Sequence, residues 1–389
     1  MLSKKTAALA AVAGATIVAL GVSIAPASAF DPVSNGYAIV GSDTLEDAVG
    51  ALVNGSNATG SGVRITAADS STLGNFDATG SGTIITKPYG IRFQRPNGSG
   101  DGRTALKAQI AGTAYTSTYA SRDTNYNATT LTGTPIDIVR SSSGATVNAS
   151  GVLTRYTFGR DAIAFAYGTS VTPGANGYIS AADLKLIYQC DATTLAAYGI
   201  TNPVIPQSGS GTRSDFISKI AFGTDTLPTS TTDTTTCVRV GQEHDASTLG
   251  ATQLMPMSAS RWIAMKNGVS YNRAGTAALG SAVSGTAAVD VNGGVYTPNL
   301  TYYKDNTWGR DTYVFVDQRR IDPTNARYDA VLAALFSYTD ATSLTYQGGA
   351  SNVLGNLTAL PSFPAYTSAA VKLKYGFLPA SVQDENRAN

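Results

Sequence analysis

Gly209-Ser210-Gly211-Thr212 stands directly before a helical run at residues 213–220, and this turn indicates what kind of fold the chain forms. The first backbone N–H groups of a helix have no partner inside the helix, and the helix dipole adds partial positive charge there. Glycine lets an anion approach the backbone, and the hydroxyls add hydrogen-bond donors. One such turn is usually only a helix cap. The chain contains more turns of this kind, and together they predict an anion site.

Three further turns rich in hydroxyl groups follow short apolar runs that read as strands. The runs lie at residues 37–40, 83–86 and 136–139, and helical patterns follow the first two. The four turns carry the candidate site residues Ser42, Thr44, Ser99, Gly100, Arg140, Ser141, Ser142, Ser210, Gly211, Thr212 and Arg213. Arginine matters here because its planar guanidinium matches a tetrahedral oxyanion.

Strand and helix candidates alternate along the rest of the chain. Residues 161–167 and 313–316 read as strands, whereas residues 180–188, capped by Ser180, and residues 328–336 read as helices. This alternation predicts an α/β fold with mixed, mostly parallel sheets flanked by helices. Such sheets bind ligands at the carboxyl ends of their strands, so we expect the hydroxyl turns to meet at one edge.

The N-terminal segment has the pattern of a signal peptide. Lys4 and Lys5 precede an apolar run at residues 7–24, and Ala27-Ser28-Ala29 is a small-residue cleavage signal. We therefore expect a secreted, extracellular or cell-surface protein whose residues 1–29 are removed after Ala29. No cysteine stands directly after the cleavage site, so the sequence does not predict a lipid anchor.

The composition of the remaining 360 residues excludes some classes of function. They carry 25 basic and 26 acidic residues, which argues against a nucleic-acid partner because such proteins present a basic face. The two cysteines, Cys190 and Cys237, are expected to form a disulfide in an oxidising compartment, worth about 4 kcal/mol in the chain-entropy model. The chain has a single histidine, His244, so the sequence predicts no metal site and no cofactor.

Most catalytic motifs are missing from the sequence. It contains no Gly-x-Ser-x-Gly elbow, no Gly-Lys pair of a phosphate-binding loop and no His-Glu-x-x-His. A Ser–His–Asp triad would have to use His244 in the segment Gln242-Glu243-His244-Asp245, which we interpret instead as an exposed polar turn or a helix start. Paired carboxylates for glycoside hydrolysis stay open, although nothing singles out a pair.

Five collinear stretches resemble the extracellular phosphate-binding proteins of bacterial ABC importers, especially a divergent actinobacterial branch. They cover residues 40–44, 95–99, 136–142, 159–164 and 206–213. The resemblance implies a two-lobed, type II periplasmic-binding-protein-like fold with a ligand cleft between the lobes. It also implies that phosphate is bound by Thr44, the backbone N–H of Leu45, Ser99, Ser210, Gly211 and Thr212.

Two positions depart from the family's pattern. The better-known phosphate binders have an aspartate where this chain has Ser142, and that carboxylate accepts a proton from the ligand and so selects against sulfate. They also have an arginine where this chain has Pro206. We hypothesise that Arg140 and Arg213 supply the missing charge, and other small oxyanions therefore stay open beside phosphate.

We predict a monomeric, non-catalytic solute-binding protein that captures phosphate or a similar oxyanion and presents it to an ABC permease. Lobe 1 is expected to combine residues 36–145 with 308–389, and lobe 2 to comprise residues 146–307. Two alternatives stay open. One is a secreted surface or adhesion protein that keeps the fold without transport, and the other is a phosphoester hydrolase that uses His244 or Asp245.

Overall fold

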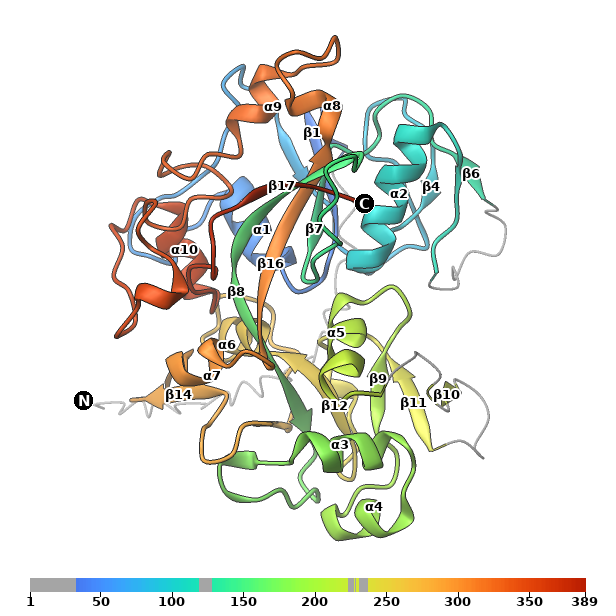
Figure 1. The fold of residues 1–389 in the computed structure, drawn as a ribbon, viewed down its shortest axis with the longest axis vertical. Helices are drawn as coiled ribbons and strands as arrows, with labels where there is room; N and C mark the ends of the chain where they lie inside the picture. The colour runs from blue at the N-terminus through green and yellow to red at the C-terminus, as the bar shows by residue number, and fades with distance from the viewer. Residues whose placement is uncertain (1–32, 119–127, 223–226, 228, 231–236) are drawn as a thin grey trace, which may run out of the picture. The chain divides into compact units, whose positions relative to one another are not determined.

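The computed structural model describes residues 33–118, 128–222, 227, 229–230 and 237–389 (Figure 1). Residues 31–389 form one compact unit. The expected signal peptide lies outside the described residues. Within the described residues, no helix combines the length and the hydrophobicity that crossing a bilayer requires.

A mixed sheet runs through the centre of the unit in the order β12-β8-β16-β7-β1-β2. Its parallel part joins β1 to β2 and to β7, whereas β8 and β16 pair antiparallel with each other and with their other neighbours. Two short strands, β13 and β17, also pair with β8. The strands are β1 (Tyr37–Gly41), β2 (Leu73–Asn75), β7 (Ile138–Ser141), β8 (Leu153–Tyr167), β12 (Leu254–Ser258), β13 (Ala278–Gly280), β16 (Gly309–Asp317) and β17 (Glu385–Ala388).

A second, parallel sheet has the order β10-β11-β9, and its strands are Thr229–Ser230, Val238–Gly241 and Val204–Pro206. The long strands β8 and β16 run between the elements around β1 and those around β9 (Figure 1). Three two-stranded pairs complete the described strands: β3 (Thr83–Ile84) with β4 (Phe93–Gln94), β5 (Ala114–Tyr115) with β6 (Thr129–Thr130), and β14 (Val289–Asn292) with β15 (Val295–Pro298).

Helices pack against these sheets, which confirms the α/β class. Ser180 caps its helix as expected, because its hydroxyl accepts a hydrogen bond from the backbone N–H of Asp183 at 3.0 Å. The α-helices are α1 (Glu46–Asn54), α2 (Ser99–Ala111), α3 (Ala181–Tyr188), α4 (Ala192–Tyr198), α5 (Gly211–Lys219), α6 (Ala259–Lys266), α7 (Leu300–Lys304), α8 (Gln318–Ile321), α9 (Ala330–Ala334) and α10 (Ser368–Lys374).

Separate apolar cores hold the elements on either side of the site. One core packs the buried face of α1, including Val49 and Leu52, against Ile39 of β1. Another packs Phe216 of α5 against Ile205 of β9. The expected disulfide between Cys190 and Cys237 is confirmed, with the two Cα atoms 6.0 Å apart, and both side chains pack against the second of these cores. Each strand and the helix that follows it are thus fixed together, which positions the turn between them.

The sequence pattern failed at one strand of the central sheet. The strand expected at residues 83–86 is only the two-residue β3, paired with β4 outside the central sheet, whereas β2 at Leu73–Asn75 had no strand signal. A Leu-Gly-Asn segment has low β-propensity, and its pairing with β1 makes it a strand. The late helix expected at residues 328–336 is shorter and covers Ala330–Ala334.

Candidate functional site

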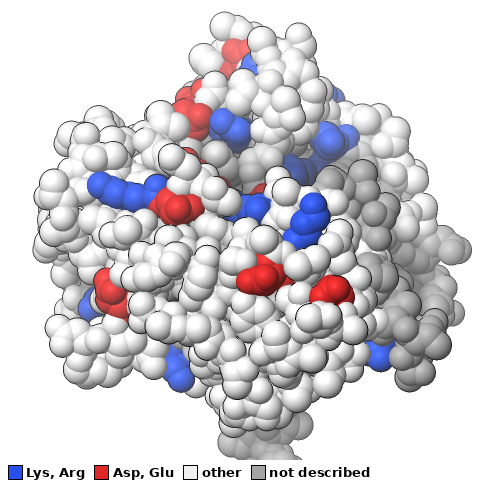
Figure 2. Space-filling view, turned by 60° about the horizontal axis from the view of Figure 1, so that its bottom comes forward, with Lys and Arg blue, Asp and Glu red and all other residues white. Residues whose placement is uncertain are grey.

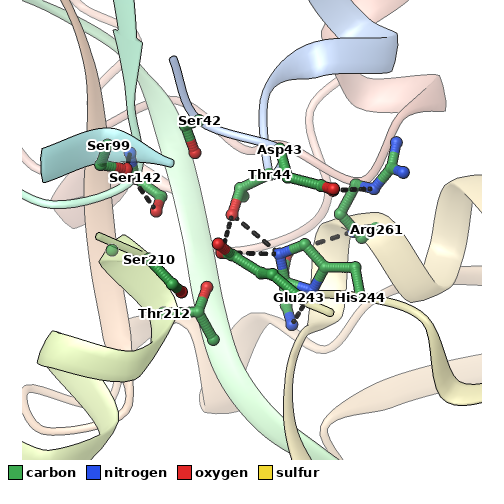
Figure 3. A network of polar contacts seen from close by, with 12 residues as sticks. Ser42, Asp43, Thr44, Ser99, Ser142, Ser210, Thr212, Glu243, His244 and Arg261 are labelled. Carbon is green, nitrogen blue, oxygen red and sulfur yellow. Dashed lines mark hydrogen bonds and ion pairs between the residues drawn. The ribbon is translucent and has the colours of Figure 1, made fainter. Parts of the chain in front are cut away.

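Six hydroxyl side chains gather where the turns predicted from the sequence meet. We call Ser42, Thr44, Ser99, Ser142, Ser210 and Thr212 the hydroxyl cluster, and all six are buried. Figure 3 shows them around the carboxylate of Glu243. The first four follow β1, β4 and β7, and the last two lie at the start of α5. Side chains from distant parts of the sequence are therefore brought to one place.

Three helices begin at the cluster. Leu45 precedes α1, Ser99 is the first residue of α2, and Ser210 caps α5 by accepting a hydrogen bond from the backbone N–H of Arg213 at 3.0 Å. The helices have 9, 13 and 9 residues, so each contributes partial positive charge at this end. The hydroxyl of Ser42 is fully buried and has no hydrogen-bond partner among the residues that the structure describes. Together these groups favour a negatively charged occupant.

The start of α5 lies tightly against the serines of the other elements. Ser142 donates its backbone N–H to Ser99 Oγ at 2.9 Å, and the two hydroxyl oxygens are 3.1 Å apart. A Cβ added to Gly211 would lie 2.5 Å from both of these oxygens. The backbone N–H of Gly100 also donates to the carbonyl of Gly209 at 3.0 Å. Glycine at position 211 is thus required for this close approach.

A buried carboxylate occupies the centre of the cluster. Glu243 Oε1 lies 3.4 Å from Thr44 Oγ1 and 3.2 Å from His244 Nε2, and His244 Nε2 lies 2.9 Å from Thr44 Oγ1. The other carboxylate oxygen of Glu243 has no hydrogen-bond partner within the described part of the chain. The turn that carries Glu243 and His244 was expected to be exposed, and this expectation is wrong because both side chains are fully buried.

The pair has opposite pKa shifts. Burial on its own raises the pKa of Glu243, but hydrogen bonding and charge from His244 and the hydroxyls of Ser210 and Thr212 lower it to about 2. Burial on its own lowers the pKa of His244, but Glu243 outweighs burial and the pKa of His244 is raised. Glu243 and His244 therefore each favour the charged form of the other.

Arg310 of β16 contacts both the hydroxyl cluster and two acidic side chains. One of its terminal nitrogens donates to Thr212 Oγ1 at 2.9 Å and to Thr44 Oγ1 at 3.3 Å. The same guanidinium pairs with Asp161 at 2.9 Å and with Asp215 at 3.1 Å. Burial on its own lowers the pKa of Arg310, but the nearby acids, led by Asp161 and Asp215, together outweigh burial and raise it. Arg310 thus holds both threonines in place and supplies positive charge beside them.

The two arginines expected beside the ligand have other partners in the structure. Arg140 is fully buried, and its guanidinium donates to the carbonyls of Ser42 at 3.1 Å and Phe76 at 2.8 Å. Arg213 donates to the carbonyl of Pro206 at 2.9 Å and lines a small cavity of about 170 Å³ beside Ser210. Arg140 therefore positions the turn after β1, whereas Arg213 flanks the start of α5.

The remaining predicted residues lie at the edge of the cluster. Leu45 is buried at the start of α1, and Ser141 donates its hydroxyl to the carbonyl of Ser143 at 2.7 Å and accepts from Arg103. Sequence reasoning missed Glu243 as a site residue, and it missed Arg310 altogether. The single signal available was the acidic and basic composition of residues 242–245, because Arg310 stands in an ordinary strand pattern.

A polar cavity of about 320 Å³ lies next to the turn that carries Glu243. Gln242 and Asp245, which flank the Glu243-His244 pair, both line it, and Arg273 lines it from another loop. The cavity is also lined by Ala78, Thr79, Gly80, Ser81, Gly82, Arg95, Asn97 and Ser117. On the face shown in Figure 2, basic and acidic side chains are scattered among uncharged ones. No group of three metal-ligating side chains occurs among the residues described.

Comparison with known proteins gives similarity in structure but not in sequence. No family model matches the chain, and no curated protein matches it. An ABC-type phosphate transport receptor from Vibrio cholerae is 14% identical, with a TM-score of 0.40, over 76% of this chain and 93% of that one. A phosphate ABC transporter substrate-binding protein with bound phosphate, described as putative, from Clostridium perfringens is 13% identical, with a TM-score of 0.41, over 78% and 93%.

Proposed function

We propose that the protein is a secreted, non-catalytic solute-binding protein that holds a small oxyanion in the hydroxyl cluster, with phosphate as the first candidate. The single observation that carries this proposal is that six buried hydroxyls and three helix N-termini surround a carboxylate. A carboxylate is itself an oxyanion, so the cluster already has the donors that such a group requires. Delivery of the ligand to an ABC permease belongs to the same proposal.

The proposal also includes the two lobes expected from the sequence. Lobe 1 comprises residues 36–145 and 308–389, and lobe 2 comprises residues 146–307. Thr44 and Ser99 then belong to lobe 1, and Ser210 and Thr212 to lobe 2. The contact of Gly211 with Ser99 and Ser142 corresponds to the closed form. An oxyanion bound by hydroxyls of both lobes stabilises closure, because it contributes hydrogen bonds to each lobe only when they are together.

The hydrolase alternative has one observation in its favour, the 2.9 Å distance between Thr44 Oγ1 and His244 Nε2. A general base must accept the proton of the nucleophile. His244 Nε2 also faces the carboxylate of Glu243 at 3.2 Å, so we assign a proton to this nitrogen from its neighbours. That nitrogen then donates to Thr44 and is unable to activate it. The geometry favours binding over catalysis.

Isothermal titration calorimetry of the secreted chain with phosphate, sulfate and arsenate tests this function. We expect saturable heat with at least one of the three ions, and a tenfold or larger loss in Ser99→Ala. Ser150→Ala removes an exposed hydroxyl outside the cluster and is the matched control. The absence of heat and of any thermal shift with all three ions would contradict the proposal.

A further inference from the structure

Glu243 uses the same hydroxyls that an oxyanion ligand would need. Its carboxylate lies against Thr44, and the hydroxyls of Ser210 and Thr212 stabilise its charged form. It is fully buried and comes from the turn after β11. A second anion at contact distance would meet strong repulsion, because a buried site screens charge poorly. Glu243 and a bound oxyanion therefore compete for one position.

The turn that carries Glu243 borders a cavity. The 320 Å³ cavity is lined by residues on both sides of the Glu243-His244 pair, and Arg273 also lines it. His244 has a φ of +60°, in the left-handed region that non-glycine residues rarely adopt. The backbone N–H of Glu243 is fixed to Gln207 Oε1 at 2.8 Å, so the side chain can turn about a held backbone.

We infer that Glu243 is a tethered competitor, whose carboxylate fills the oxyanion position until a soluble oxyanion displaces it toward the cavity lined by Gln242, Asp245 and Arg273. This inference rests on the proposed function and adds a selectivity rule to it. The ligand must offer the cluster at least as much negative charge and as many hydrogen-bond acceptors as the carboxylate of Glu243 does. Tetrahedral oxyanions satisfy this rule because they have more acceptor oxygens than a carboxylate. Simple monocarboxylates offer the cluster no more acceptors than Glu243 already does, so we do not expect them to displace it.

The charges around Glu243 come from several elements. His244 is its neighbour on the same turn, and Arg310 of β16 faces it through Thr44 and Thr212. Asp43 lies on the side of His244, paired with Arg261 of α6 at 3.4 Å between Oδ1 and Nε. Removing the charge of Glu243 takes away the carboxylate that faces His244 at 3.2 Å, whereas Arg310 keeps its pairs with Asp161 and Asp215. An external oxyanion then supplies the missing negative charge.

The test uses the full chain and compares the affinities of inorganic phosphate and sulfate in four proteins. These are the wild type, Glu243→Gln, Glu243→Ala and the matched control Glu385→Gln, which changes a glutamate on β17 away from the cluster. We expect both Glu243 variants to bind at least one ion tenfold or more tightly than the wild type. We expect Glu385→Gln to stay within twofold of it. The alanine variant shortens the side chain and covers the case in which glutamine keeps the position filled.

The outcomes separate the inference from the function on which it rests. Weaker or unchanged binding in both Glu243 variants would overturn the competitor role while leaving oxyanion binding intact, and weaker binding would make Glu243 a direct ligand contact. Binding seen only after substitution of Glu243 would support the competitor role and would contradict oxyanion capture by the wild type. Absence of binding in all four proteins would overturn the proposed function and the inference together.

Discussion

The hydroxyl of Thr44 and the imidazole Nε2 of His244 lie 2.9 Å apart, although the two residues are 200 positions apart in the chain. Thr44 follows the first strand of the central sheet, and His244 follows the middle strand of the second sheet. This contact therefore fastens together the turns of two different sheets. It also ties Thr44 to the Glu243 carboxylate, which is the chemical centre of the site.

The first prediction concerns Thr44→Val, which keeps the shape of the side chain and removes its hydroxyl. We expect phosphate affinity to fall by about 1.5–3 kcal/mol, the range for a hydrogen bond to a charged group. The free energy of unfolding should also fall by about 1–3 kcal/mol, because a buried N–H of His244 or Arg310 loses its acceptor. Calorimetry and urea denaturation measure the two effects. An unchanged affinity would place Thr44 outside the ligand's contacts.

The second prediction is a stability maximum in mildly acidic solution. The pKa of Glu243 is lowered to about 2, so its contribution is present above its unfolded value of about 4.5 and is lost as the pH falls toward 2. The pKa of His244 is raised, so its contribution is complete below about 6.5 and is lost as the pH rises through the folded value. The pair therefore contributes most between about pH 4.5 and 6.5.

Urea denaturation across pH 3–9 checks this maximum. The loss above pH 6.5 should diminish in His244→Gln, which keeps a hydrogen-bonding side chain but has no titrating group. A wild-type profile that rises steadily from pH 6 to 9 would contradict a raised pKa for His244. The other charged groups that act on the pair, Asp43 and Arg310, are unchanged in this variant.

Local sequence was sufficient for the parts of the site that belong to strand-turn-helix units. Ser99, Ser142 and Ser210 could be predicted to lie in turns, because each turn is recognised by glycine and hydroxyl residues next to an apolar run. The α/β class followed from the alternation of these units. The strand β2 could not be predicted, because its pairing with β1 rather than its own propensity makes it extended.

The charged centre of the site could not be predicted in the same way. Glu243 and His244 are polar residues in a turn, and such residues are usually exposed. They are buried here because the hydroxyl of Thr44, from a distant segment, provides a hydrogen-bond partner for His244 and also contacts the carboxylate of Glu243. Arg310 lies 266 positions from Thr44, and nothing near it in sequence reveals the contact. Contacts between charged and polar side chains that are distant in sequence determine this part of the site. No local sequence pattern reveals such contacts.

The third prediction concerns Arg310, which contacts the buried Asp161, the partly exposed Asp215 and two threonine hydroxyls. Arg310→Met should lower the free energy of unfolding by about 3–5 kcal/mol, because Asp161 is left as an uncompensated buried charge. Arg310→Lys should cost less, since it keeps the charge but loses the planar fork that reaches several partners. Urea denaturation of both variants measures the order. Equal stability of the lysine variant and the wild type would contradict the need for the fork.

The last prediction separates folding from closure through Gly211→Ala. Gly211 begins α5 and has no positive φ, so alanine suits the helix itself. Its added Cβ would, however, lie 2.5 Å from Ser99 Oγ and Ser142 Oγ, which belong to the opposite side of the cluster. We expect α5 to form normally while its start moves away from the two serines.

Oxyanion affinity should then fall by at least tenfold, and small-angle scattering with phosphate should report a more open particle than the wild type. Gly355→Ala, whose Cβ would meet nothing within 4 Å, is the matched control. If Gly211→Ala binds as tightly as the wild type, the close approach of α5 to Ser99 and Ser142 is not the arrangement that holds the ligand.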